Sequence, residues 1–200
     1  MMVEAMTLLL KQLNDYVAQA DGGAPGAPVQ AVWGNVAQLE RPEVASELEN
    51  HIVLTLVNLE EERTLKNGRS FATVGPSDIA YRNRPVHLNL FVLFTANYRN
   101  YGTALRRLSQ VLAFFQGKQK FTLANSPGAL PQVPIAEFSL TMDLLSPTFE
   151  EVNHLWGFLG AKQVASVLYR GRLVAISDDR VLAGGGRIRE IDVLSRDATQ

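Results

Sequence analysis

The sequence predicts an α+β or mixed α/β fold, with helices packed on a single mixed sheet of about five strands. The first reason is residues 85–98, where β-branched and aromatic side chains favour an extended chain. One face of this strand is apolar and consists of Val86, Leu88, Leu90, Val92 and Phe94. The other face is polar at the start of the strand and apolar toward its end. We therefore expect the first end to be exposed to solvent and the second end to be buried.

The second reason is a helix that follows this strand directly. Residues 101–116 carry apolar side chains at helical spacing, and Gly117 is placed to end the helix. The stripe that we expect to face the sheet consists of Leu105, Leu108, Val111, Leu112 and Phe115. A long strand that leads into a helix therefore forms the centre of the predicted domain.

The remaining elements follow from the same two periodicities. Residues 2–20 form an amphipathic helix, and Thr148 with Glu151 forms a capping box at the start of another. Strands are expected at residues 29–39, 51–59, 121–123, 136–144 and 165–176. Residues 51–59 are apolar on both faces, which indicates an interior strand.

Two segments are assigned more specifically. Residues 41–49 are expected to be one helical turn or a loop. Residues 136–144 alternate, which places Phe138, Leu140, Met142 and Leu144 inside.

Composition restricts the class of protein. The 200 residues indicate one domain at 1–177 with a C-terminal arm at 178–200. A net charge of −1 gives no general attraction to nucleic acid or to anionic membranes. The absence of cysteine excludes disulfides and thiolate chemistry. No apolar run is long enough to span a bilayer and no export signal is visible, so a soluble protein is expected.

A polar stretch at residues 60–84 interrupts the predicted sheet. It begins with Glu60, Glu61 and Glu62, contains Arg69, and shows little periodicity. A loop this long inside a compact domain is usually functional. The three glutamates fit a solvated strand end, paired carboxylates for acid–base chemistry, or a patch for a basic partner.

The C-terminal arm is expected to hold a glycine hinge and a short strand. The hinge is Gly184–Gly186, and the strand is residues 187–194, beginning with Arg187. Ile191 and Val193 lie on one face of this strand.

Residues suited to catalysis are few. His51, His87 and His154 are far apart, and none has metal-ligand spacing with another histidine or a carboxylate. No nucleophile elbow, P-loop or dinucleotide fingerprint occurs. Arg170 and Arg172 lie on one strand face, where they suit either an interface rim or solvated side chains. No reactive or metal-binding site is visible in the sequence, and this profile favours a protein that binds proteins.

Three blocks of sequence resemble the cap proteins, or tail terminators, of extracellular contractile injection systems. They are residues 83–98, residues 101–116, and residues 149–162 continued by 166–172. The helix with Asn153, Leu155 and Trp156, followed by Ser166 and Tyr169, carries the most specific part. The resemblance extends over about residues 2–177.

This resemblance implies a tail-terminator fold that assembles as a hexameric ring. Such a ring ends the growth of the inner tube and the sheath and holds the two together, so their proteins are the implied partners. The resemblance also implies a protein that is not an enzyme and needs no cofactor. The particle would be assembled in the cytoplasm and then released as an extracellular phage-tail-like particle. Residues 60–84 are expected to contact tube or sheath, and residues 187–194 to add as a strand to the sheath or a neighbouring cap.

Three other interpretations stay open at this point. A tail terminator of a contractile phage would have a similar sequence. A small-molecule-binding module would use Trp33, Tyr98 and Tyr101 to line a pocket. A hydrolase would use the glutamates at 60–62 or His87.

Overall fold

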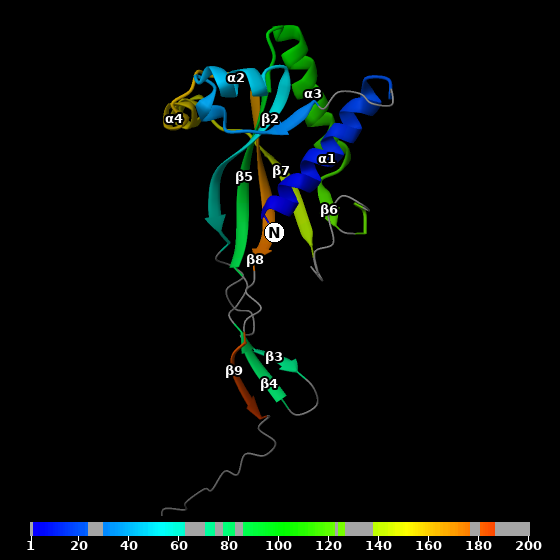
Figure 1. Ribbon diagram of the computed structural model, residues 1–200, viewed down its shortest axis with the longest axis vertical. Helices are drawn as coiled ribbons and strands as arrows, with labels where there is room; N and C mark the ends of the chain where they lie inside the picture. Colours follow the sequence, from blue (N-terminus) through cyan, green and yellow to red (C-terminus); the bar gives the residue numbers. More distant parts are fainter. Residues whose placement is uncertain are drawn as a thin grey trace, which may run out of the picture.

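The computed structural model describes residues 2–23, 30–62, 71–74, 78–82, 86–122, 124–126, 138–176 and 181–186. The predicted mixed α/β class is confirmed, with six strands in the main sheet and a second, smaller sheet (Figure 1). The main sheet has the order β1-β2-β5-β8-β7-β6. Only the pairing of β1 with β2 is parallel within it.

The strands of the main sheet differ greatly in length. Its long strands are β2 (His51–Glu61), β5 (Val86–Asn97), β8 (Ser166–Ile176) and β7 (Ser139–Leu145). Both edges are short strands, β1 (Ala31–Trp33) and β6 (Lys120–Thr122). Because each edge strand pairs with only part of its neighbour, no described strand covers the rest of the outer edges of β2 and β7.

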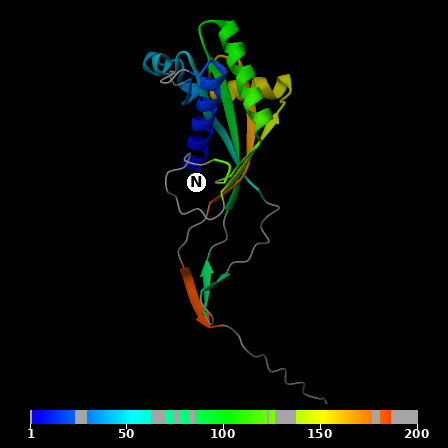
Figure 2. The ribbon, with the colours of Figure 1, turned by 90° about the vertical axis from the view of Figure 1, so that its right-hand side faces the viewer.

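Helices cover both faces of the main sheet (Figures 1 and 2). Helices α1 (Met2–Ala20) and α3 (Tyr101–Gly117) share the larger apolar core with one face. Helix α4 (Phe149–Leu159) packs on the other face, where Trp156 contacts a cluster that contains Leu93 and Val36. The short helix α2 (Pro42–Leu48) and the 3-10 turn Val36–Gln38 connect β1 to β2.

The strand expected at the centre is interior, between β2 and β8, and is buried at its C-terminal end. Val92 and Phe94 are fully buried, whereas Val86 is 43% exposed. Phe94 packs edge-on against Phe115 at 5.2 Å and against Tyr169 at 5.6 Å, measured between ring centroids. Each such aromatic contact contributes about 0.5–1.5 kcal/mol beyond burial alone. This cluster joins α3 to the centre of the sheet.

The termini of α4 follow the sequence signals. The Thr148 hydroxyl accepts a hydrogen bond from the Glu151 N–H, and the Glu151 carboxylate accepts one from the Thr148 N–H. Gly160 ends the helix in the left-handed region, at φ 64°. The predicted capping box is therefore present.

Two predictions about burial were wrong. Leu144 is 51% exposed because it lies beyond the end of β6, where no described strand covers β7. Leu105 and Leu112 are 45% and 36% exposed, because α3 turns Ala104, Val111 and Phe114 toward the core instead.

The prediction of a polar loop at residues 60–84 was also wrong. The segment contains the last residues of β2 and two further strands, β3 (Phe71–Val74) and β4 (Asp78–Arg82). These pair antiparallel and form a three-stranded sheet with β9 (Val181–Gly186). The partner strand β9 is about a hundred residues away along the chain, a separation that local periodicity does not reveal.

The glycine run is part of this small sheet and not a hinge. Gly184, Gly185 and Gly186 lie in β9 and pair with Ala80, Ile79 and Asp78. Glycine is uncommon inside strands because it adds no side-chain packing. Three consecutive glycines therefore suggested a hinge between strands and not a strand. The expected strand at residues 187–194 lies outside the described residues, and the domain division at residue 177 stays a prediction.

Candidate assembly surface

The sequence-predicted glutamates lie at the C-terminal end of β2. Glu60 and Glu61 are exposed, and Glu62 follows directly. The Asn89 side-chain amide of β5 donates to Glu62 Oε2 at 3.2 Å. Asn89 is only 6% exposed, and its Oδ1 has no hydrogen-bond partner among the described residues. This end of the sheet therefore combines acidic side chains with a buried polar atom that is unsatisfied.

Arg170 and Arg172 lie on β8 and share one carboxylate. Arg172 Nη2 donates to Asp143 Oδ1 at 3.1 Å, and Arg170 Nη2 lies 3.9 Å from Asp143 Oδ2. Asp143 stands directly opposite Arg170 across the β7–β8 pair. Both arginines therefore contact a carboxylate on the neighbouring strand. The sequence, which suggested an interface rim or solvated side chains, did not predict this contact.

These two groups share one face of the main sheet. Glu60 lies opposite Asn89 on β5, and Phe91, two residues further, lies opposite Arg170. Residues directly opposite across strands, or two apart along a strand, point to the same side. The same side holds Leu93, which packs under α4. The candidate residues thus form a polar sheet face beside α4, which we define by Glu60, Asn89, Arg170, Arg172 and Asp143.

The remaining predicted contact residues are not placed. Arg69, Arg187, Ile191 and Val193 lie outside the described residues.

Exposed apolar side chains gather around two grooves. One groove, of about 810 Å³, lies between α3 and α4 and is lined by residues that include Tyr98, Tyr101, Leu105 and Leu144. The other, of about 740 Å³, lies where β1 ends and is lined by residues that include Trp33 and Phe158. Trp33 and the two tyrosines line different grooves, so they do not form the single ligand pocket considered from sequence.

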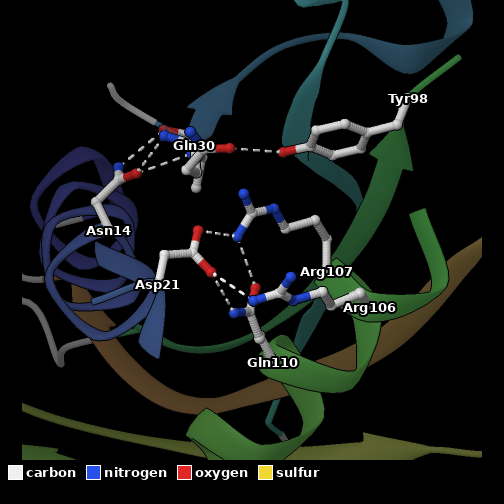
Figure 3. A network of polar contacts seen from close by, with 8 residues as sticks. Asn14, Asp21, Gln30, Tyr98, Arg106, Arg107 and Gln110 are labelled. Carbon is white, nitrogen blue, oxygen red and sulfur yellow. Dashed lines mark hydrogen bonds and ion pairs between the residues drawn. The ribbon is translucent and has the colours of Figure 1, made fainter. Parts of the chain in front are cut away.

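A polar network joins the end of α1 to α3 (Figure 3). Asp21 pairs with Arg106 and Arg107 of α3 and accepts a hydrogen bond from the Gln110 amide at 3.0 Å. Burial raises the pKa of Asp21, but the hydrogen bonds from Arg107 and Gln110 outweigh burial and hold it below its ordinary value of 3.8. The network fixes α1 against α3, which is a structural role.

The same network extends to β1 and β5. The Asn14 side-chain oxygen accepts from the backbone N–H groups of Gln30 and Ala31, at 2.9 and 2.8 Å. The Tyr98 hydroxyl donates to the Gln30 side chain at 3.1 Å, and burial raises the pKa of that hydroxyl. Sequence reasoning did not find this cluster, because its members come from four separate segments of polar residues with no shared motif.

The described residues contain no group of three histidines, carboxylates or cysteines that could hold a metal ion. His51, His87 and His154 belong to β2, β5 and α4. Within the described part of the chain, no helix has the length and apolar character needed to cross a membrane. The described residues present two apolar grooves, strand edges that no described strand covers, and a polar face, which are features of protein–protein contacts.

Residues 4–190 match the family described as the Pvc16 N-terminal domain. The chain belongs to this family. Among curated proteins, none matches the sequence.

Two solved structures share the fold. One is the PVC sheath/tube terminator of an extracellular contractile injection system, in its extended state. It has a TM-score of 0.52 at 12% identity and covers 95% of this chain and 64% of its own. The other is the anti-feeding prophage cap, described as a tube-terminating cap. It has a TM-score of 0.50 at 17% identity and covers 72% of this chain and 49% of its own. This member of the Pvc16 N-terminal domain family therefore spans about two thirds and about half of the two terminators.

Proposed function

We propose that this chain is the cap subunit that terminates the inner tube and the sheath of an extracellular contractile injection particle. The observation that carries the proposal is the shared fold with the PVC sheath/tube terminator, which extends over 95% of this chain. Membership of the Pvc16 N-terminal domain family over residues 4–190 supports it. The role is structural: the subunit binds tube and sheath proteins and catalyses no reaction.

The cap acts as a ring, and we propose six copies. A cyclic ring is built from heterologous contacts, in which one surface of a subunit meets a different surface of the next. The chain offers a suitable pair of surfaces, because the two apolar grooves have no lining residue in common and hold different exposed side chains. The ring assembles in the cytoplasm and leaves the cell as part of the particle.

Contacts with tube and sheath are assigned to the polar sheet face and to residues not placed by the structure. Glu60, Glu61 and Glu62 supply negative charge at one end of β2, and Arg170 with Arg172 supplies positive charge on β8. Arg69 is assigned to the same contacts. Surfaces that carry both signs of charge favour a single docking orientation.

The experiment is particle assembly with and without the cap subunit, scored by electron microscopy as the distribution of tube and sheath lengths. We expect one narrow length distribution and a six-fold density at the particle end when the subunit is present. Without it, lengths should spread and sheaths should separate from tubes. An unchanged length distribution in the deletion, with normal sheath attachment, would contradict the proposal.

A further inference from the structure

Among the residues that the structure describes, no strand covers most of the outer edge of β2. Strand β1 pairs with β2 only from Ala31 opposite Ile52 to Trp33 opposite Leu54. Strand β2 continues to Glu61, paired with β5 on its other side. No described strand lies on the β1 side of residues 56–61. This part of β2 can therefore accept a further strand.

Some backbone N–H and C=O groups of this part of β2 point away from β5, toward the outer edge of the sheet. The Glu62 N–H donates to the His87 carbonyl of β5 at 2.8 Å, so the alternate residue Glu60 also faces β5. The backbone of Leu59, which precedes Glu60 and so has the opposite orientation, points away from β5 toward the outer edge. Its N–H donates to the Asn58 side-chain oxygen at 2.9 Å, a local bond that an incoming strand can replace.

An apolar groove continues this edge where β1 stops. It is the groove of about 740 Å³ described above. Its lining includes Met6 of α1 from one face of the sheet, Phe158 of α4 from the other, and Leu56 of β2 between them. Trp33 is 46% exposed, Leu56 is 38% exposed and Phe158 is 81% exposed. The groove thus has apolar walls on both sides of the position that a strand added to β2 would take.

One segment of this chain has the chemistry to fill that position. Residues 187–194 read Arg-Ile-Arg-Glu-Ile-Asp-Val-Leu, in which Arg187, Arg189, Ile191 and Val193 alternate on one face of an extended chain. The segment follows β9, which runs away from the main sheet (Figures 1 and 2). Residues 187–194 follow the end of β9 that lies farther from the main sheet (Figure 1). We therefore expect them to reach the β2 edge of another molecule and not that of their own.

We propose that residues 187–194 of a second copy add to the open edge of β2 as an antiparallel strand. The inference deepens the proposed function and rests on it, since it names the contact that joins neighbouring subunits of the ring. Such an exchange links each subunit to the next by backbone hydrogen bonds.

Charge decides the direction of the added strand. In the antiparallel orientation, Arg187 and Arg189 lie near the acidic end of β2 at Glu60 and Glu61. The parallel orientation would bring the acidic end of the segment there instead, and like charges across strands are destabilising.

Apolar pairing fits the same orientation. Leu56 and Leu59 lie opposite Val92 and Leu90, two buried residues of the core under α1. They therefore belong to one face of the sheet, where Ile191 and Val193 extend the apolar surface.

The test is disulfide cross-linking, which the absence of native cysteine makes specific. One chain carries Leu59→Cys, and a second chain carries Arg189→Cys, Ile191→Cys or Val193→Cys. Three partners are used because the proposal fixes the face of the added strand but not which of these residues lies opposite Leu59. The two chains are mixed, oxidised and analysed by denaturing electrophoresis. We expect the best of the three pairs to give about tenfold more covalent dimer than the matched control Leu59→Cys with Glu190→Cys, whose second thiol points to the opposite face.

The readout is scored separately in solution and on capped particles. Equal dimer yields for same-face and opposite-face pairs, or no covalent dimer in either setting, would overturn the strand addition. Capped particles without cross-links would overturn it and leave the proposed function standing. Cross-links in a protein that fails to cap tubes would support the strand addition and overturn the proposed function.

A second variant tests the edge without added cysteines. Leu59→Pro removes the outward N–H of Leu59 and leaves the bonds of its neighbours to β5 in place. We expect loss of oligomer by light scattering, whereas Leu59→Ala, which keeps the N–H, should retain it. Equal oligomer formation by both variants, with unchanged circular dichroism, would contradict the proposal.

Discussion

At the scale of single residues, two aspartates join segments that are distant in the sequence. Asp21 joins the end of α1 to Arg106, Arg107 and Gln110 of α3. Asp143 joins β7 to two arginines of β8. Sequence reasoning identified Arg170 and Arg172 as candidates, but it could not identify Asp143 as their partner, because the cross-strand register is set by tertiary structure.

The Asp21 network predicts a pH dependence of stability. The pKa of Asp21 is lowered on folding, so its contribution is present above the ordinary value of 3.8 and is lost as pH falls through the lower folded value. Asp21→Asn should lower the free energy of unfolding at pH 7 by less than about 1 kcal/mol, since the pair is partly open to solvent. The difference in free energy of unfolding between Asp21→Asn and the wild type, measured by urea titration, should become smaller as the pH is lowered toward 3.

The matched control for this prediction is Asp15→Asn, which removes an exposed carboxylate from α1, the helix that ends directly before Asp21. It changes net charge equally but does not touch Arg106 or Arg107. If both variants show the same stability and the same pH profile, the Asp21 network contributes nothing specific to folding.

At the scale of secondary-structure elements, local signals succeeded where they were strong. The capping box at Thr148 and Glu151 begins α4 as predicted, and the alternation in residues 85–98 gives β5. They failed where a strand is held mainly by distant partners. Strands β3 and β4 were missed in a polar stretch, and β9 was mistaken for a hinge because of its glycines.

One glycine is required by packing of the connection after β1. A Cβ at Gly34 would lie 2.7 Å from Leu48 Cδ2 and 2.9 Å from Val53 Cγ1. We expect Gly34→Ala to destabilise the fold by about 1–3 kcal/mol, because α2 must shift away from β2. Thermal and urea unfolding measure the change.

Gly157 supplies the control for this prediction, since it lies inside α4 with nothing within 4 Å of an added Cβ. Gly157→Ala should stabilise the fold by about 0.5–1 kcal/mol, through the higher helix propensity of alanine. Destabilisation by both alanines to a similar extent would refute the packing argument at Gly34.

At the scale of the whole molecule, the exposed apolar groups lie where we propose that other subunits bind. Both edge strands of the main sheet are short, and large apolar side chains lie in the two grooves. Apolar side chains that remain in water do not stabilise the monomer, and exposed apolar patches are typical of interaction sites. Their placement therefore supports the proposal that the subunit assembles with other subunits.

Phe158 tests this view. It is 81% exposed and lines the groove at the end of β1. Phe158→Ser should change the stability of the monomer by no more than about 0.5 kcal/mol, as is usual at surfaces. It should weaken oligomer formation, measured by light scattering over a range of concentrations.

Phe149→Ser is the matched control, because Phe149 is 96% exposed on the same helix and belongs to neither of the two grooves described. Oligomer formation should be nearer to the wild type in this variant. Equal loss in both variants would assign the effect to general surface hydrophobicity and not to the groove.

The sequence by itself determined the mixed α/β class, the limits of α1, and the strand-to-helix centre of the domain. Periodicity, caps and alternation are local, and they act on neighbours within a few residues. Only the tertiary structure decided that a second sheet exists, that Asp143 joins Arg170 and Arg172, and that no described strand pairs with the outer edge of β2 beyond Leu54. Each of these depends on which strands meet and in what register, and register is fixed by contacts between residues far apart along the chain.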